Sequence, residues 1–203
     1  MSLPDQVEFN RPKKYVPVEE LGSGACGKTI LLRDDEMGIN VVAKKYCPIV
    51  SISDDPNLYK DLMRRFRDEA RIMFQINHPN IVRVFNFFDY QEANTSYIIM
   101  EYIPGKNFFE YIESNPDQLD EIFQKVISGF FHLEERAILH RDIRPQNLLI
   151  SDNGEPKIID FGFGKQLTMI QQDENKSISL NWWCEVPPEF SRSDYDNQTE
   201  VYF

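Results

Sequence analysis

The segment from His140 to Asn147 carries side chains that could orient a hydroxyl group and bind a metal ion. Asp142 has a carboxylate that could accept the proton of an alcohol, and Asn147, five residues later, has an amide oxygen that could bind Mg²⁺. Thirteen residues after Asn147, an Asp-Phe-Gly triplet begins with Asp160, a second oxygen ligand. A proton acceptor beside two magnesium ligands predicts a phosphoryl-transfer site.

A glycine-rich segment upstream could bind the phosphates of a nucleotide. Gly22, Gly24 and Gly27 form a G-x-G-x-x-G pattern, which lets backbone N–H groups approach phosphate oxygens closely. A dinucleotide-binding loop has the same pattern, but it follows a strand and opens a helix. Here the glycines precede two strand-like runs, 29–32 and 40–46, joined by a polar turn. We therefore favour an antiparallel hairpin over a dinucleotide-binding loop.

Two adjacent lysines in the second strand could pair with these phosphates. The pattern V-A-x-K points to Lys45, but that choice puts the charge of Lys44 where an apolar side chain is expected to pack. The alternation of a strand favours Lys44 instead, with Val42 on the same face. We predict Lys44 and keep Lys45 as the alternative.

In their order and spacing, these segments resemble the eukaryotic-type protein kinase family, of the serine/threonine-like kind. The resemblance implies that Asp142 is the catalytic base, that Lys44 binds the phosphates of ATP, and that Asn147 and Asp160 hold Mg²⁺. It also implies that Glu69 positions Lys44.

Two further residues follow from the resemblance. Glu69 lies in a helix predicted over 57–76, nine residues before a His-Pro-Asn-Ile-Val segment at 78–82. Arg144 occupies a position where serine/threonine kinases usually have lysine, and it would give positive charge near the γ-phosphate. The following Pro145 favours serine and threonine acceptors over tyrosine.

The resemblance also implies a nucleotide pocket beside a hinge at 97–105. Met100 would border the adenine, and backbone groups of Glu101 and Ile103 would bind its edge. The predicted ATP-binding residues are Leu21, Gly22, Gly24, Gly27, Thr29, Val42, Lys44, Met100, Glu101, Ile103 and Leu149.

The expected fold class is α+β, with the two lobes of a protein kinase. A small lobe with an antiparallel sheet and one main helix would span 1–103, and a mostly helical large lobe would span 104–203. A helix predicted over 120–136 has a broad apolar face. The large lobe looks short, as in compact bacterial effector kinases, and a second copy could cover that face if it is exposed.

The stretch from 163 to 185 corresponds to the activation segment of the family. Arg141 could bind a phosphate placed on Thr168, Ser177 or Ser179, which would allow autophosphorylation to order this segment. Trp182 departs from the threonine usual in serine/threonine kinases, so the surface that receives the acceptor is expected to be unusual.

Composition limits the partners. A net charge of −11 and a pI of about 4.8 argue against nucleic acid or an anionic membrane as partners. No apolar run is long enough to span a bilayer. Three cysteines without a C-x-x-C pair favour reduced thiols, so we expect a cytoplasmic protein, or one secreted into a host cytosol if it is an effector.

The expected function is an ATP- and Mg²⁺-dependent protein kinase acting on a protein acceptor. Two alternatives stay open. A small-molecule kinase of the aminoglycoside type shares the fold logic, although Arg141 stands where that family prefers glycine. A nucleotide-binding pseudokinase or scaffold would lack transfer, although the complete set of predicted catalytic residues argues against it.

Overall fold

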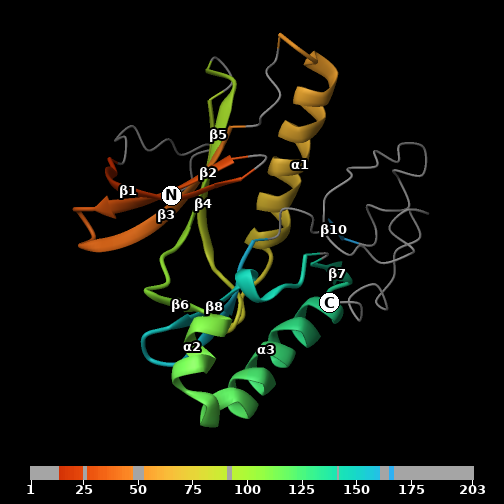
Figure 1. Cartoon of the computed structure of the whole chain (residues 1–203). Helices are drawn as coiled ribbons and strands as arrows, with labels where there is room; N and C mark the ends of the chain where they lie inside the picture. The colour runs from red at the N-terminus through yellow and green to blue at the C-terminus, as the bar shows by residue number, and fades with distance from the viewer. Residues whose placement is uncertain are drawn as a thin grey trace, which may run out of the picture.

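A five-stranded antiparallel sheet forms most of the first lobe in the computed structural model, which describes residues 14–24, 27–47, 53–90, 93–140, 142–160 and 165–166. Its strands lie in the order β1-β2-β3-β5-β4 (Figure 1). Their bounds are Val16–Gly24 for β1, Gly27–Asp34 for β2, Ile39–Tyr46 for β3, Val84–Tyr90 for β4 and Thr95–Glu101 for β5. The hairpin of β2 and β3 confirms the two strands expected after the glycines.

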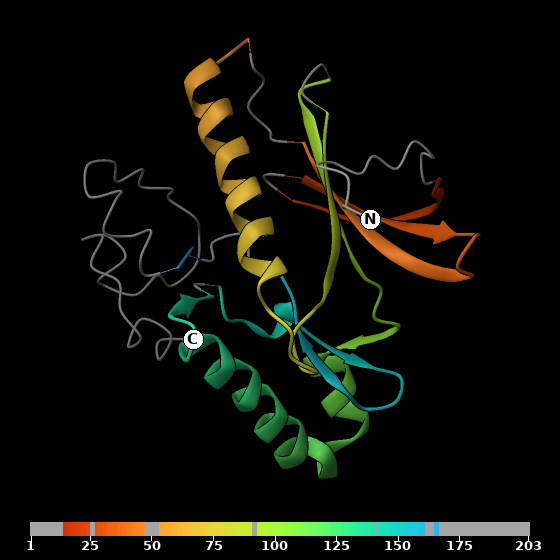
Figure 2. The same cartoon turned by 180° about the vertical axis from the view of Figure 1, so that it is seen from behind.

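Helix α1 (Pro56–Phe74) runs alongside this sheet, as Figure 2 shows from behind. The Asp55 side chain accepts hydrogen bonds from the backbone N–H groups of Asn57 and Leu58, and Pro56 suits the first turn because its missing N–H would have no partner there. The buried side chains of α1, among them Phe66 and Met73, pack with apolar residues of β3, β4 and β5. The helix expected over 57–76 is therefore confirmed within two residues at each end.

The second lobe contains two helices and two small sheets. Strand β6 (Gly105–Asn107) leads into α2 (Phe108–Ser114), a short 3-10 turn (Pro116–Gln118) and α3 (Leu119–Glu134). Strands β6, β8 (Leu148–Ser151) and β9 (Pro156–Ile158) form one sheet, and β7 (Ile138–Leu139) pairs with β10 (Lys165–Gln166). Figure 1 shows this lobe below the first one, which confirms the two-lobed α+β class.

The two lobes meet where the segment after α1 runs beside β9. Ile81 forms a parallel bridge with Ile158, the Val82 N–H donates to the Ile158 carbonyl at 2.9 Å, and the Ile158 N–H donates to the Asn80 carbonyl at 2.8 Å. Residues on both sides of the boundary predicted after 103 therefore share backbone hydrogen bonds. The boundary itself stays a prediction.

None of the helices in the described ranges is both long and apolar enough to cross a membrane. The predicted activation segment from 163 to 185, apart from the backbone of 165–166, lies outside the described residues, as does Arg141.

Candidate active site

Lys44 joins two carboxylates that come from distant parts of the chain. Its Nζ atom lies 2.7 Å from Oε1 of Glu69 on α1 and 2.7 Å from Oδ1 of Asp160, just after β9. The side chains of Lys44 and Glu69 are 16% and 5% exposed, whereas Asp160 is 41% exposed. One ammonium group thus connects the sheet, the helix and the second lobe, and Asp160 retains access to solvent.

The charge of Lys44 is stabilised by its partners. Burial by itself opposes the protonated form, but the nearby carboxylates of Glu69 and Asp160 outweigh it and raise the pKa of Lys44 above its ordinary value. The lysine therefore stays cationic over the physiological pH range, as a group that binds phosphate must.

Lys45 lies on the other face of β3. Its Nζ atom is 5.8 Å from the centre of the Tyr97 ring, a cation–π geometry on the side of the sheet away from α1. The alternation used to choose between the two lysines thus holds in β3. The contact with Glu69 belongs to Lys44.

Asp160 occupies a strained backbone position. Its φ angle is +61°, in the left-handed region that residues with a Cβ seldom adopt. The preceding residue is fixed from two sides, because the Ile159 N–H donates to the Asn147 carbonyl at 2.8 Å and the Ile159 carbonyl lies 3.1 Å from Nε2 of His140. Such strain is found mainly where the surrounding structure imposes a functional geometry.

Asp142 is held by two side chains of its own loop. Asn147 donates from Nδ2 to the Asp142 backbone carbonyl at 2.9 Å and to its Oδ2 atom at 2.8 Å, and Arg144 Nη2 lies 3.2 Å from the same Oδ2. The Asp142 side chain is 13% exposed and that of Arg144 is 45% exposed. The carboxylate is therefore oriented, and the guanidinium beside it remains open to solvent.

His140 connects the Asp142 loop with the end of β9. The Asp142 N–H donates to Nδ1 of His140 at 3.3 Å, so this nitrogen must be an acceptor, and Nε2 then carries the proton that is donated to the Ile159 carbonyl. Burial lowers the pKa of His140, which favours the neutral ring. The structural role expected for His140 agrees with this geometry.

Asn147 and Asp160 have the chemistry of magnesium ligands. The amide nitrogen of Asn147 is used by Asp142, which leaves its Oδ1 atom as the group suited to a cation. Within the described ranges, no group of three or more His, Cys, Asp and Glu side chains could hold a metal ion. Mg²⁺ bound with a nucleotide uses one or two protein oxygens together with phosphate oxygens, so this pair fits it.

The glycines of the β1–β2 hairpin differ in what surrounds them. A Cβ atom on Gly27 would lie 2.3 Å from the Lys45 carbonyl oxygen, whereas one on Gly22 would meet nothing within 4 Å. Gly27 is therefore required by the close approach of β3. The space beside Gly22 leaves room for a ligand.

The residues predicted around adenine come from three strands and the segment after β5. Val42, Met100, Ile103 and Leu149 belong to one apolar cluster, and Val42 on β3 is paired with Met100 on β5. Thr29 on β2 is paired with Lys44, and Leu21 on β1 is 44% exposed. The structure thus brings these side chains to the side of the sheet that faces Lys44.

Glu101 has a partner that the sequence did not indicate. Its carboxylate oxygens lie 2.8 and 3.0 Å from Nζ of Lys157 on β9, and its backbone N–H donates to the Arg83 carbonyl at 2.9 Å. Only the carbonyl of Glu101, not its N–H, is left as a candidate for the adenine edge. Fifty-six residues separate Glu101 from Lys157, so no local pattern signals their contact.

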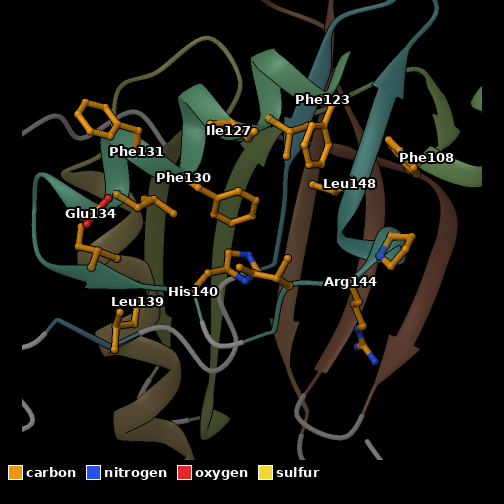
Figure 3. A pocket seen from close by; sticks show the side chains of 15 residues that line it. Phe108, Phe123, Ile127, Phe130, Phe131, Glu134, Leu139, His140, Arg144 and Leu148 are labelled. Atoms are coloured by element: carbon orange, nitrogen blue, oxygen red, sulfur yellow. The ribbon is translucent and has the colours of Figure 1, made fainter. Parts of the chain in front are cut away.

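A pocket of about 590 Å³ lies on α3, next to the Asp142 loop (Figure 3). Phe123, Ile127 and Phe131 line it from the helix, and they are 55%, 50% and 58% exposed. Figure 3 shows the Phe130 ring between α3 and His140, and the Arg144 side chain at the edge of the pocket, directed away from the aromatic rings. This pocket is apolar and separate from the Lys44 site.

Comparison with known proteins agrees with this geometry. The model of the protein kinase domain matches residues 15–202. The chain is 30% identical over 207 residues to serine/threonine-protein kinase 1 of Arabidopsis thaliana, covering 99% of this chain and 23% of that protein. It is 27% identical over 210 residues to serine/threonine-protein kinase pakA of Dictyostelium discoideum, covering 100% of this chain and 16% of that protein.

A bacterial relative gives the same result. The chain is 30% identical over 169 residues to serine/threonine-protein kinase PrkC of Bacillus subtilis, covering 81% of this chain and 25% of that protein. The chain therefore spans a quarter or less of the length of these three relatives.

Proposed function

Because the chain belongs to the protein kinase family, we propose that it transfers the γ-phosphoryl group of ATP to serine or threonine hydroxyls of a protein acceptor, with Mg²⁺. The observation that carries this proposal is the contact of Lys44 with both Glu69 and Asp160. It unites a phosphate-binding cation with a metal ligand beside the Asp142 loop.

Nucleotide binding would use both faces of the interlobe site. Lys44, fixed by Glu69, binds the α- and β-phosphates, while the backbone around Gly22 and Gly24 covers them. Val42, Met100 and Leu149 contact the adenine ring through apolar surface. The backbone of Ile103 and the carbonyl of Glu101 bind its edge.

Transfer would depend on orientation and charge. Asp142 accepts a hydrogen bond from the acceptor hydroxyl and takes its proton, with its carboxylate aimed by Asn147. Arg144 lies beside that carboxylate and offers positive charge to the γ-phosphate. Asn147 Oδ1 and the Asp160 carboxylate hold Mg²⁺, which neutralises the phosphate charge that develops during transfer.

Three finer proposals accompany the activity. The acceptor is a protein, and Arg144 followed by Pro145 favours serine or threonine. The protein phosphorylates itself on the segment from 163 to 185. The lobes correspond to 1–103 and 104–203, and the protein works in a cytoplasm without nucleic acid or membrane as partner.

The test is phosphate transfer from labelled ATP with Mg²⁺, using generic protein acceptors and, separately, small alcohols. An Asp160→Gly variant is the matched control, because glycine adopts a φ of +61° without strain and should fold while losing a metal ligand. We expect labelled protein with the native chain and a loss of about 100-fold or more with the variant.

Other outcomes identify the alternatives. Label on small alcohols alone would indicate a small-molecule kinase. Nucleotide binding without transfer to any acceptor would indicate a pseudokinase. Equal transfer by the native chain and by folded Asp160→Gly would exclude Asp160 as a metal ligand.

A further inference from the structure

Two of the three histidines stack against each other away from the Lys44 site. His78 lies in the segment after α1, and His132 lies in the last turn of α3. Their ring centres are 4.8 Å apart with an interplanar angle of 42°, and both side chains are partly buried. The pair forms a contact between the first-lobe segment 76–82 and the helix of the second lobe.

Hydrogen bonds fix both rings in the neutral form. Nδ1 of His78 accepts from the backbone N–H of Asn80 at 3.2 Å, and Nδ1 of His132 lies 3.2 Å from Nη1 of Arg136, which can only donate. Each ring therefore carries its proton on Nε2. A second proton would go to Nδ1, where it would face an N–H donor and remove the existing hydrogen bond.

The surroundings of the pair also oppose a charge. Burial lowers the pKa of His78 below its ordinary value of 6.5, and His132, Arg136 and Lys157 lower it further. Burial and Arg136 lower the pKa of His132, while Glu135 acts in the opposite direction. Ser128, 3.4 Å from Nε2 of His78, is uncharged, and Lys157 is itself paired with Glu101.

We propose that the His78–His132 pair is a proton-sensitive joint between the lobes, closed when both rings are neutral and opened when either ring gains a proton. Protonation removes a hydrogen bond at Nδ1 and places the new charge against Arg136 and the second imidazole. The same joint would oppose the binding of a metal cation, because Arg136 and Lys157 already give this region positive charge.

The joint leads directly to β9 and from there to Asp160. Asn80, whose N–H bonds to His78, accepts from the Ile158 N–H and donates from Nδ2 to the Pro156 carbonyl at 3.0 Å. A shift of Asn80 would therefore disturb β9 two residues before Asp160. This consequence for activity rests on the proposed kinase function, but the opening of the joint does not.

The direction of the pH effect follows from linkage. Because both rings bind a proton less readily in the folded state, their contribution to stability is complete above the unfolded pKa of about 6.5 and decreases as the pH falls below it. His140, also buried with a lowered pKa, adds an acid sensitivity of its own. A test must therefore separate the pair from His140.

The first measurement is an NMR titration of the imidazole Cε1 carbons together with hydrogen exchange, with no nucleotide present. We expect His78 and His132 to titrate below 6.5, and the amides of Val82 and Ile158 to lose protection about tenfold more than intrinsic rates predict for each pH unit below that midpoint. Titration of both rings near 6.5 with unchanged protection would overturn the proposal.

The second measurement compares thermal unfolding between pH 5 and 8 for three variants. His132→Phe keeps an aromatic ring but cannot titrate, so it should flatten the pH response, and Arg136→Gln should move the midpoint toward 6.5. Lys60→Gln, an exposed charge removal on α1, is the matched control and should follow the native curve. An unchanged curve for folded His132→Phe would overturn the proposal, and the NMR titration of the native chain decides the matter if that variant does not fold. ATP affinity, measured in parallel, should decrease with the opening, and failure of that readout alone would count against the kinase function.

Discussion

At the scale of residues, the candidate site depends on one buried cation that serves two carboxylates. Glu69 is almost fully buried and Asp160 is partly exposed, yet both bind the same Nζ atom at 2.7 Å. A buried carboxylate without a cation is costly, so Lys44 stabilises the fold as well as preparing the site for phosphate. Lys45, on the opposite face, has no such role.

Replacement of each lysine by methionine separates these two positions. Lys44→Met keeps the apolar stem but removes the charge, so we expect at least about 100-fold lower transfer and a free energy of unfolding lower by about 3 kcal/mol. The loss of stability should shrink at acidic pH, because a protonated Glu69 needs no cation. Kinase assays and urea unfolding measure the two effects.

Lys45→Met is the matched control, because it removes the same charge one residue away. Only its contact with Tyr97 is lost, worth about 0.5–1 kcal/mol, and transfer should stay near the native rate. Inactive Lys45→Met beside active Lys44→Met would reverse the assignment of the phosphate lysine.

At the scale of elements, the β2–β3 hairpin explains why Gly27 must be glycine. We expect Gly27→Ala to lower the free energy of unfolding by about 1–3 kcal/mol, because its Cβ would collide with the Lys45 carbonyl oxygen. Gly22→Ala is the control: it meets no protein atom and should keep native stability, but it should weaken ATP binding if phosphates lie there. Thermal unfolding and calorimetric titration test both, and equal stability of the two variants would contradict the packing argument.

Local patterns predicted the elements well, because helices and hairpins depend on near neighbours. The apolar spacing of α1 and the polar turn before β3 indicated both elements within two residues of their bounds. Strand alternation also distinguished Lys44 from Lys45, since side chains on a strand alternate between faces whatever the rest of the chain does.

Contacts between distant segments could not be predicted in this way. The pairs Glu101–Lys157 and His78–His132 join residues more than fifty positions apart, and their partners become neighbours only when β9 and α3 pack against the segment after α1. The left-handed backbone of Asp160 is likewise imposed from outside, by the hydrogen bonds that hold Ile159. The requirement for Gly27 comes from β3, so the glycine pattern alone suggested a different reason for it.

At the scale of the whole molecule, three contacts connect the lobes around the candidate site. Lys44 connects β3 with Asp160, Glu101 connects the end of β5 with Lys157 on β9, and the segment after α1 shares backbone hydrogen bonds with β9. All three involve β9 or the residue that follows it closely. The position of this short strand therefore governs how the two lobes meet.

The apolar surface of α3 is the second property of the whole molecule that calls for a test. Phe123, Ile127 and Phe131 are each at least half exposed among the described residues, on a protein whose net charge of −11 otherwise favours solubility. Where an apolar dye reports this surface as open in solution, we expect a second copy to cover it, so that the mass from light scattering rises with concentration. An Ile127→Glu variant should bind less dye and remain at the mass of one chain, while Lys60→Gln, which alters charge on α1, should behave like the native protein. A native chain that stays a monomer at every concentration and binds no dye would contradict this expectation and would mean that the surface is covered within the chain itself.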